Sequence, residues 1–121
     1  MNELTFDMLR RANVLRLPTF KNRHGQLAHS KPDGSDWSPA QWLQAAVGEL
    51  GEYANMRKKF ERGDITASEF QEAAEKELAD VVIYLDLLAF QLKVDLGLAV
   101  TNKFNEVSER VGSSMRLSLP E

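Results

Sequence analysis

The fold is decided by two stretches, WLQAAVGELGEYANMRKK at residues 42–59 and ELADVVIYLDLL at residues 77–88. In both stretches apolar residues return every three or four positions, which is the spacing of one face of an α-helix. No segment of the chain indicates a pair of strands. Two long helices therefore form the centre of the expected structure.

Local start and stop signals extend this pattern to the whole chain. Residues 38–41, SPAQ, and 66–69, TASE, are capping boxes that begin the two long helices. Glycine often ends a helix because it adopts the left-handed conformation easily, and Gly63, Gly97 and Gly112 follow three of the expected segments. The signals predict helices over residues 2–17, 38–62, 66–94 and 95–111.

These segments predict one domain, residues 1–121, of the all-α class. Short turns between the later helices indicate an antiparallel, bundle-like arrangement of four helices. Residues 18–37 show no periodicity and contain both histidines, so we expect a long loop that is functional or mobile. Because 121 residues bury only a small core, we expect the bundle to be completed by self-association.

The composition is that of an ordinary globular protein, with 43% hydrophobic and 27% charged residues. A net charge of −3 without a basic cluster argues against a partner that is a nucleic acid. The absence of cysteine excludes disulfides, thiolate metal sites and cysteine nucleophiles. There is no signal-peptide pattern and no apolar run of membrane-spanning length, so we expect a cytoplasmic protein that does not bind a membrane.

Each long helix carries two acids three residues apart, a spacing that places both on one face of the helix. The pairs are Glu49 with Glu52 and Glu77 with Asp80. Such pairs are common on solvated helices, so the neighbouring residues decide what they mean. The expected core face of the first long helix consists of Leu43, Val47, Leu50 and Ala54. A second apolar stripe, in which Glu49 and Glu52 lie, consists of Trp42, Ala45, Met56 and Phe60. The stripe that contains Glu77, with Asp80 beside it, consists of Phe70, Ala74, Val81, Tyr84, Leu88 and Leu92.

Four carboxylates on faces that the helices bury need a source of positive charge. Two ionised carboxylates about 4 Å apart repel by roughly 4 kcal/mol at an effective dielectric constant near 20. An all-oxygen ligand set favours hard ions, Mg²⁺ or its substitute Mn²⁺, over zinc or copper. A di-iron bundle pairs Glu with His on its helices, whereas His24 and His29 lie in the loop. We therefore expect a metal site made of Glu49, Glu52, Glu77 and Asp80.

The paired acids also carry a family resemblance. Glu-x-x-Glu at residues 49–52 and Glu-x-x-Asp at residues 77–80 resemble the paired motif of the MazG-like all-α nucleoside triphosphate pyrophosphohydrolases. The flanking stretches 42–59 and 77–88 are typical of that family as well, and the resemblance covers residues 37–112. The last helical segment, KFNEVSERVG, and the first helix with Asn13 resemble phage-encoded members, some of which act on dGTP.

The resemblance implies a MazG fold, a magnesium-dependent reaction, and hydrolysis between the α and β phosphates of a nucleoside triphosphate. It also implies homodimers or homotetramers with the site near a subunit interface, acting in the host cytoplasm if the chain is phage-encoded. Tyr84 matches a position near the substrate in the family. Lys103, Asn105 and Arg110 fall where the family has phosphate contacts, although Lys103-Phe104-Asn105 departs from the commoner spacing.

Other residues are candidates on chemical grounds. Glu49 is our choice for the general base among the four acids. Lys59 belongs to a basic group that either contacts phosphates or complements the negative end of its helix. Aromatic and amide side chains outside the signature are expected to select the base, with a purine deoxynucleotide favoured by the phage-like resemblance alone. We expect at least two base-contacting residues among Asn13, Phe20, His29 and Trp37.

Two other functions remain open at this stage. In the first alternative, the chain is a non-catalytic bundle that binds metal and nucleotide. In the second alternative, it is a structural oligomerisation module whose acids are solvated. Release of pyrophosphate in a single turnover separates an enzyme from the first alternative. Absence of stabilisation by metal would favour the second alternative.

Overall fold

The fold is all-α, as the sequence predicts. The structure, a computed structural model, describes residues 3–28 and 31–118, so His29 lies outside the described residues. Its four α-helices are α1 (Phe6–Arg16), α2 (Pro39–Glu61), α3 (Ala67–Gln91) and α4 (Leu96–Val111), with a short 3₁₀ helix, η1 (Leu17–Thr19), after α1. None of the described helices has both the length and the apolar character needed to cross a membrane.

The ends of the two long helices follow their local sequence. Both capping boxes form: the Ser38 hydroxyl accepts from the Gln41 amide and the Thr66 hydroxyl accepts from the Glu69 amide. However, α3 ends at Gln91, earlier than the predicted Val94. Lys93 takes the left-handed conformation with φ 59°, and the Val94 amide donates to the Ala89 carbonyl, which closes the helix. This helix end has no glycine, so the sequence gives no sign of it.

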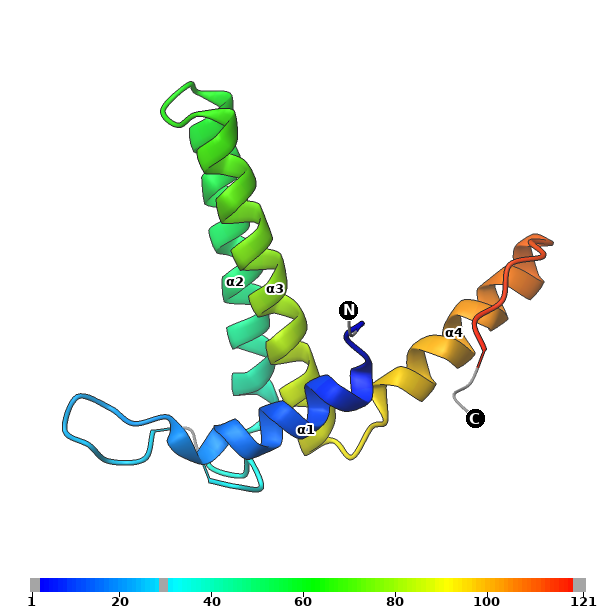
Figure 1. The fold of residues 1–121 in the computed structure, drawn as a ribbon, viewed down its shortest axis with the longest axis horizontal. Helices are drawn as coiled ribbons and strands as arrows, with labels where there is room; N and C mark the ends of the chain where they lie inside the picture. The colour runs from blue at the N-terminus through cyan, green and yellow to red at the C-terminus, as the bar shows by residue number, and fades with distance from the viewer. Residues whose placement is uncertain (1–2, 29–30, 119–121) are drawn as a thin grey trace.

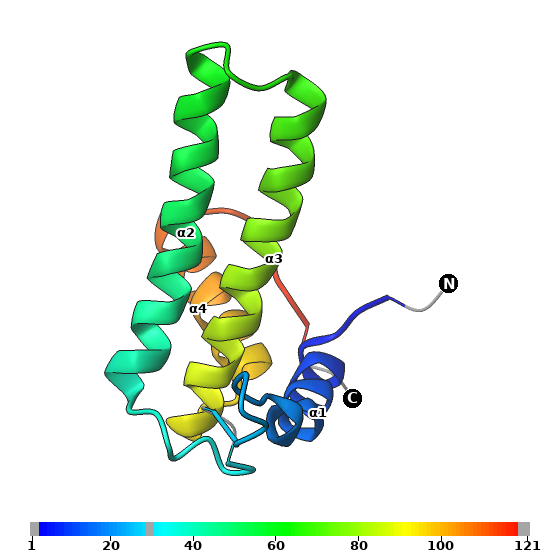
Figure 2. The ribbon, with the colours of Figure 1, turned by 90° about the vertical axis from the view of Figure 1, so that its left-hand side faces the viewer.

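Helices α2 and α3 run antiparallel and form a long hairpin (Figure 2). Near its turn, the rings of Phe60 and Phe70 stack with centroids 4.9 Å apart. At its other end, the Trp42 and Tyr84 rings lie 6.3 Å apart. These aromatic contacts set the register of the two helices, and the acids of the signature lie between them along the hairpin.

The most buried part of the molecule lies at the end of the hairpin where α2 begins and α3 ends. Leu17, Trp42 and Leu87 form its centre, and four partly buried side chains pack around them: Phe20, Trp37, Tyr84 and Leu88. The loop over residues 18–37 is fixed here in part, because the Trp42 indole donates to the Gly34 carbonyl at 3.3 Å. Gly34 is buried with φ +70°, a conformation that side chains disfavour.

Helix α1 crosses α3 and is held by a buried carboxylate. Asp86 is 1% exposed and accepts from Arg10 Nε and from Asn13 Nδ2, both at 3.0 Å. The Arg10 guanidinium also donates to the Val94 carbonyl at 3.0 Å. One arginine therefore joins α1 to α3 and to the turn that leads into α4.

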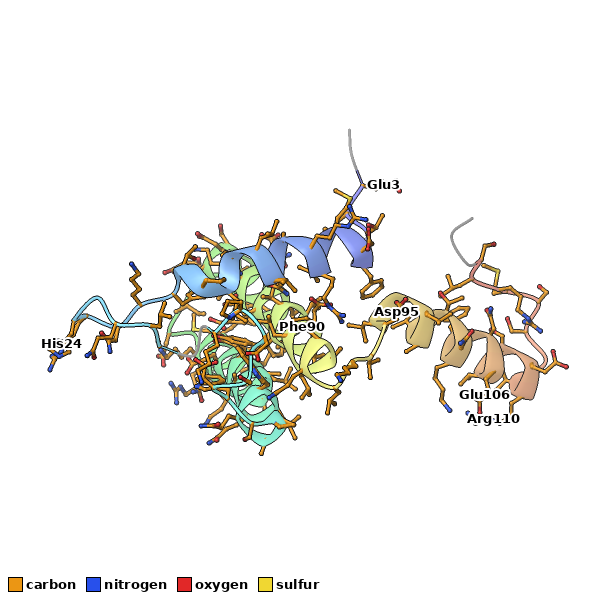
Figure 3. The ribbon with its side chains drawn as sticks, turned by 90° about the horizontal axis from the view of Figure 1, so that it is seen from below. Glu3, His24, Phe90, Asp95, Glu106 and Arg110 are labelled. Carbon is orange, nitrogen blue, oxygen red and sulfur yellow. The ribbon has the colours of Figure 1, made fainter. Side chains whose placement is uncertain are left out.

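Helix α4 stands apart from the hairpin within one chain. Figure 1 shows it extending away from the foot of the hairpin, and its contacts in the described residues are mainly with α1. Figure 3, seen from below, places His24 and Arg110 at opposite ends of the molecule. The expected bundle therefore consists, in a single chain, of one antiparallel pair with a crossing helix and a separate helix.

The expected core face of α2 is wrong for the single chain. Leu43, Val47 and Leu50 are 50%, 58% and 49% exposed, and Ala54 is exposed as well. The other apolar stripe is the covered one, with Trp42 fully buried and Ala45, Met56 and Phe60 partly buried. The reason is that α2 has one neighbouring helix along its length, so only the face toward α3 is covered.

Candidate metal centre

Three of the four predicted metal ligands converge between α2 and α3. Glu49 extends from α2, and Glu77 and Asp80 extend from α3, where their spacing puts them on one helix face. One carboxylate oxygen from each lies within 4.8 Å of the other two, and all three residues are partly buried. The register of the hairpin thus produces a three-carboxylate cluster from residues far apart in sequence.

None of the ion pairs formed by the described residues involves an acid of this cluster. Hydrogen bonding with Glu77, then burial, then the negative charges of Asp80, Glu77 and Glu52 raise the pKa of Glu49 to about 7. Glu77 Oε2 is buried and has no hydrogen-bond partner among the described residues. A hard divalent ion would give this oxygen a ligand bond and relieve the repulsion, so the residues present fit a metal such as magnesium.

Glu52 does not join this cluster. It lies on the same helix as Glu49 but is exposed, and it is not among the acids whose oxygens approach within 4.8 Å. Its charge still contributes to the raised pKa of Glu49. A ligand role for Glu52 stays a prediction, and it requires the side chain to turn inward when the metal binds.

Tyr84 lies beside the cluster, one turn after Asp80. Burial, and then the charges of Glu49 and Asp80, raise the pKa of its hydroxyl, whereas the charge of Arg16 lowers it. A pocket of about 240 Å³ opens next to it, lined by Arg16, Phe20, Asp80, Ile83, Tyr84 and Leu87. The family-matched position is therefore next to both the candidate ligands and a small cavity.

The predicted base-contacting residues have different surroundings. Phe20 lines the small pocket. Trp37 packs on Trp42, with ring centroids 4.7 Å apart, near the pocket but not among its lining residues. Asn13 is 3% exposed, and its amide nitrogen donates to the Ile83 carbonyl and to Asp86, so it serves the contact between α1 and α3.

The four predicted phosphate contacts are not brought to the cluster within one chain. Lys59 is ten positions after Glu49 on α2, or about 15 Å along the helix axis. The other three lie on α4, away from the hairpin (Figure 3). There Lys103 pairs with Glu106 at 3.5 Å, Asn105 exchanges hydrogen bonds with the backbone of Leu117, and Arg110 is exposed.

Two important residues were missed by sequence reasoning. Arg16 lines the pocket, but nothing in its local sequence separates it from the other arginines of α1. Asp86 is buried at the contact of α1 and α3, and here a signal existed: it is a lone acid inside the apolar run VVIYLDLLAF. A charged residue in such a run requires a buried partner, which Arg10 supplies.

Comparison with known proteins bears on the family of the chain. No family model matches the chain. Among curated proteins, the chain is 36% identical over 93 residues to human dCTP pyrophosphatase 1. The match covers 74% of this chain and 55% of the human protein, so the chain spans about half the length of this relative. The similarity supports the resemblance to MazG-like pyrophosphohydrolases that the acidic motifs carry.

Proposed function

We propose that this chain is a MazG-like, magnesium-dependent nucleoside triphosphate pyrophosphohydrolase. It would cleave between the α and β phosphates and give a nucleoside monophosphate and pyrophosphate. The observation that carries the proposal is the convergence of Glu49, Glu77 and Asp80, with a buried Glu77 oxygen that has no partner among the described residues. The name of the human relative, which refers to a deoxynucleoside triphosphate, supports the same reaction class.

The geometry suits hydrolysis without a covalent intermediate. Glu49, Glu77 and Asp80 would hold magnesium, which neutralises phosphate charge and favours ionisation of a water molecule. Phosphoryl transfer depends mainly on positioning and charge stabilisation, so no nucleophilic side chain is needed. We assign proton acceptance from the attacking water to Glu49, which is on α2 while the other two acids of the cluster are on α3. The water oxygen would bond to the α phosphorus while the bond from that atom to the bridging oxygen breaks, so the bridging oxygen leaves with pyrophosphate.

The substrate class in this proposal is a nucleoside triphosphate, with a deoxyribose form favoured. The phage-like resemblance favours dGTP, and the name of the relative refers to dCTP. We expect the enzyme to act in the cytoplasm and to bind neither nucleic acid nor membrane. The proposed partners are the nucleotide and further copies of the chain.

Self-association as a homodimer or homotetramer belongs to the same proposal. We define the hairpin patch as six side chains of α2 and α3 that are 40–58% exposed: Leu43, Val47, Leu50, Leu78, Val82 and Leu85. At about 100° per residue, these side chains lie on the side of the hairpin away from the acidic cluster. A continuous apolar patch of this kind is typical of a protein interface.

Helix α4 supports the same arrangement. Leu98, Val100 and Phe104 are 42%, 38% and 43% exposed, so its apolar side is also largely uncovered. Gly48 and Gly51 on α2 have no atom within 4 Å of the position of a Cβ. Since each glycine inside a helix costs about 1 kcal/mol relative to alanine, close approach by a second subunit is a reason to have them. A second copy would also bring its own α4 toward the hairpin.

The test is product analysis with the common ribo- and deoxyribonucleoside triphosphates and Mg²⁺. We expect monophosphate and pyrophosphate in equal amounts, with no diphosphate, and we expect Glu77→Gln to abolish turnover. Glu72→Gln is the matched control, because Glu72 lies on the same helix in an exposed pair with Lys76. Appearance of orthophosphate and a nucleoside diphosphate would overturn the proposal, since cleavage would then occur at the β–γ bond.

A further inference from the structure

The small pocket beside Tyr84 joins the acidic cluster to a cationic and aromatic wall. Asp80 of α3 lines it together with Arg16 at the end of α1 and Phe20 after η1, and Ile83 and Leu87 contribute apolar surface. Its volume of about 240 Å³ is below the roughly 300–1,000 Å³ typical of sites that enclose a whole small ligand. It therefore suits one part of a nucleotide, and the part must be attached to phosphates that lie at the cluster.

The backbone after α1 fixes Arg16 and Phe20 against each other. Leu17, fully buried, begins the 3₁₀ turn that returns Phe20 toward the helix end, and the Thr19 hydroxyl donates to the Arg16 carbonyl at 2.6 Å. The Arg16 guanidinium then lies over the Phe20 ring, 5.4 Å from its centroid. This stacking restricts the orientation of a planar group that is otherwise exposed.

Arg16 keeps its hydrogen-bond donors available. Within residues 3–28 and 31–118 no carboxylate lies within salt-bridge distance of its guanidinium, whereas Arg10, Arg57 and Arg116 each have an acidic partner. Its positive charge lowers the pKa of Tyr84, whereas the negative charges of Glu49 and Asp80 raise it. An oriented cation beside a partly apolar cavity is suited to a ligand with hydrogen-bond acceptors.

We propose that Arg16, stacked on Phe20, binds the base of the substrate and selects bases that present two adjacent acceptors. The inference rests on the proposed function, because it places the triphosphate at the acidic cluster and the nucleoside end in the small pocket. A guanidinium offers only donors in a planar fork. It matches a carbonyl oxygen beside an unprotonated ring nitrogen, which guanine has at O6 and N7 and cytosine has at O2 and N3.

Adenine and thymine lack such an edge. In adenine, N1 and N7 each lie next to the amino group, which is a donor, and N3 has no other acceptor beside it. In thymine, the ring N–H lies between the two carbonyl oxygens. When the guanidinium of Arg16 faces either base, one of its N–H donors either has no acceptor or meets a donor of the base. The pocket therefore selects dGTP and dCTP over dATP and dTTP.

The experiment compares Arg16→Lys and Arg16→Ala with the unchanged protein on all four deoxynucleotides. We expect kcat/KM for the two preferred substrates to fall about tenfold or more in Arg16→Lys, as loss of a bidentate contact implies, with dATP and dTTP little changed. Binding of the four deoxynucleoside monophosphates, measured by calorimetry without metal, should lose the same preference. Arg11→Lys is the matched control, because Arg11 lies on α1 in an exposed pair with Asp7.

The outcomes separate this inference from the proposed function. If Arg16→Lys retains all activity and Arg16→Ala weakens every substrate equally, Arg16 contacts phosphate and the base-selection inference is wrong while the enzyme proposal stands. Unchanged base ratios in both variants would also overturn it. If no triphosphate is hydrolysed, a monophosphate preference that depends on Arg16 still supports the pocket and counts only against the enzyme. Circular dichroism of each variant checks that the helices are intact.

Discussion

At the residue scale, the acidic cluster shows how three ordinary side chains acquire a shared property. Glu49 comes from one sequence segment and Glu77 and Asp80 from another, but their oxygens meet within 4.8 Å between two helices. Their mutual repulsion is a cost that the fold bears when no cation is bound. Both predictions at this scale follow from that cost.

Metal binding should stabilise the fold through these residues. A ligand that binds only the folded state raises the melting temperature according to its concentration and affinity, so we expect Mg²⁺ or Mn²⁺ to raise the Tm. Glu77→Gln should abolish most of that rise while leaving the helical circular dichroism spectrum intact. Glu72→Gln should keep it. An equal rise in the Glu77 variant would mean that the ion binds elsewhere.

The stability of the metal-free protein should depend on the protonation of Glu49. Its pKa in the folded state is about 7, against about 4.3 for an unfolded glutamate. The folded state therefore holds the proton more tightly, and stability falls as pH rises from about 4.3 to about 7. Glu49→Gln, which stays neutral, should flatten this part of the curve in urea unfolding. A flat profile in the unchanged protein across that range would contradict the raised pKa.

At the element scale, one buried carboxylate joins two helices and, through Arg10, the turn that leads into a third. Asp86 on α3 accepts from Arg10 and Asn13 of α1, and Arg10 continues to the Val94 carbonyl before α4. The pair is buried on the aspartate side and 23% exposed on the arginine side. The direction of α1 and the start of α4 thus depend on one interaction that secondary-structure propensity does not encode.

Removal of Asp86 should loosen α1 while leaving the hairpin formed. We expect Asp86→Ala to lower the free energy of unfolding by about 3 kcal/mol, because Arg10 and the Asn13 amide lose their buried partner. Amide exchange should quicken across α1 more than across the middle of α2. Asp7→Ala, which removes the partner of Arg11 at the surface, should change stability by less than about 1 kcal/mol. Equal effects of the two substitutions would show that Asp86 does not hold α1.

At the scale of the whole molecule, the chain leaves much of its apolar surface uncovered. The hairpin patch lies on α2 and α3, whereas the exposed apolar side chains of α4 belong to a helix that extends away from the hairpin (Figure 1). A solitary chain would keep that surface in water at about 25 cal/mol per Å². A second copy can cover both surfaces, which is the basis for expecting a homodimer or homotetramer.

Disruption of the hairpin patch should therefore produce monomers. Val82 is 44% exposed, so Val82→Glu should be tolerated by the folded chain but not by an apolar interface. Light scattering after size exclusion should give a dimer or tetramer for the unchanged protein and a smaller species for the variant. Lys76→Glu, on the other side of α3, is the matched control. A monomeric unchanged protein at micromolar concentration would contradict the prediction.

Local sequence determined the helices and the spacing of the acids. Capping boxes, helical periodicity and the i, i+3 pairs act within a few residues, so the starts of α2 and α3 and the shared face of Glu77 and Asp80 were predictable. The end of α3 was not, since Lys93 takes a conformation that only its packed turn stabilises.

Tertiary structure alone decided which faces are covered. Trp42 is buried and Leu43 is half exposed, because a helix buries the side that meets a neighbour and periodicity does not identify that neighbour. For the same reason, the sequence did not predict the position of Arg16 near Tyr84, the burial of Asn13 against Asp86, or the separation of α4 from the hairpin. Each depends on contacts between segments far apart in the chain, where the free energy comes from the pair of surfaces and neither segment carries the information by itself.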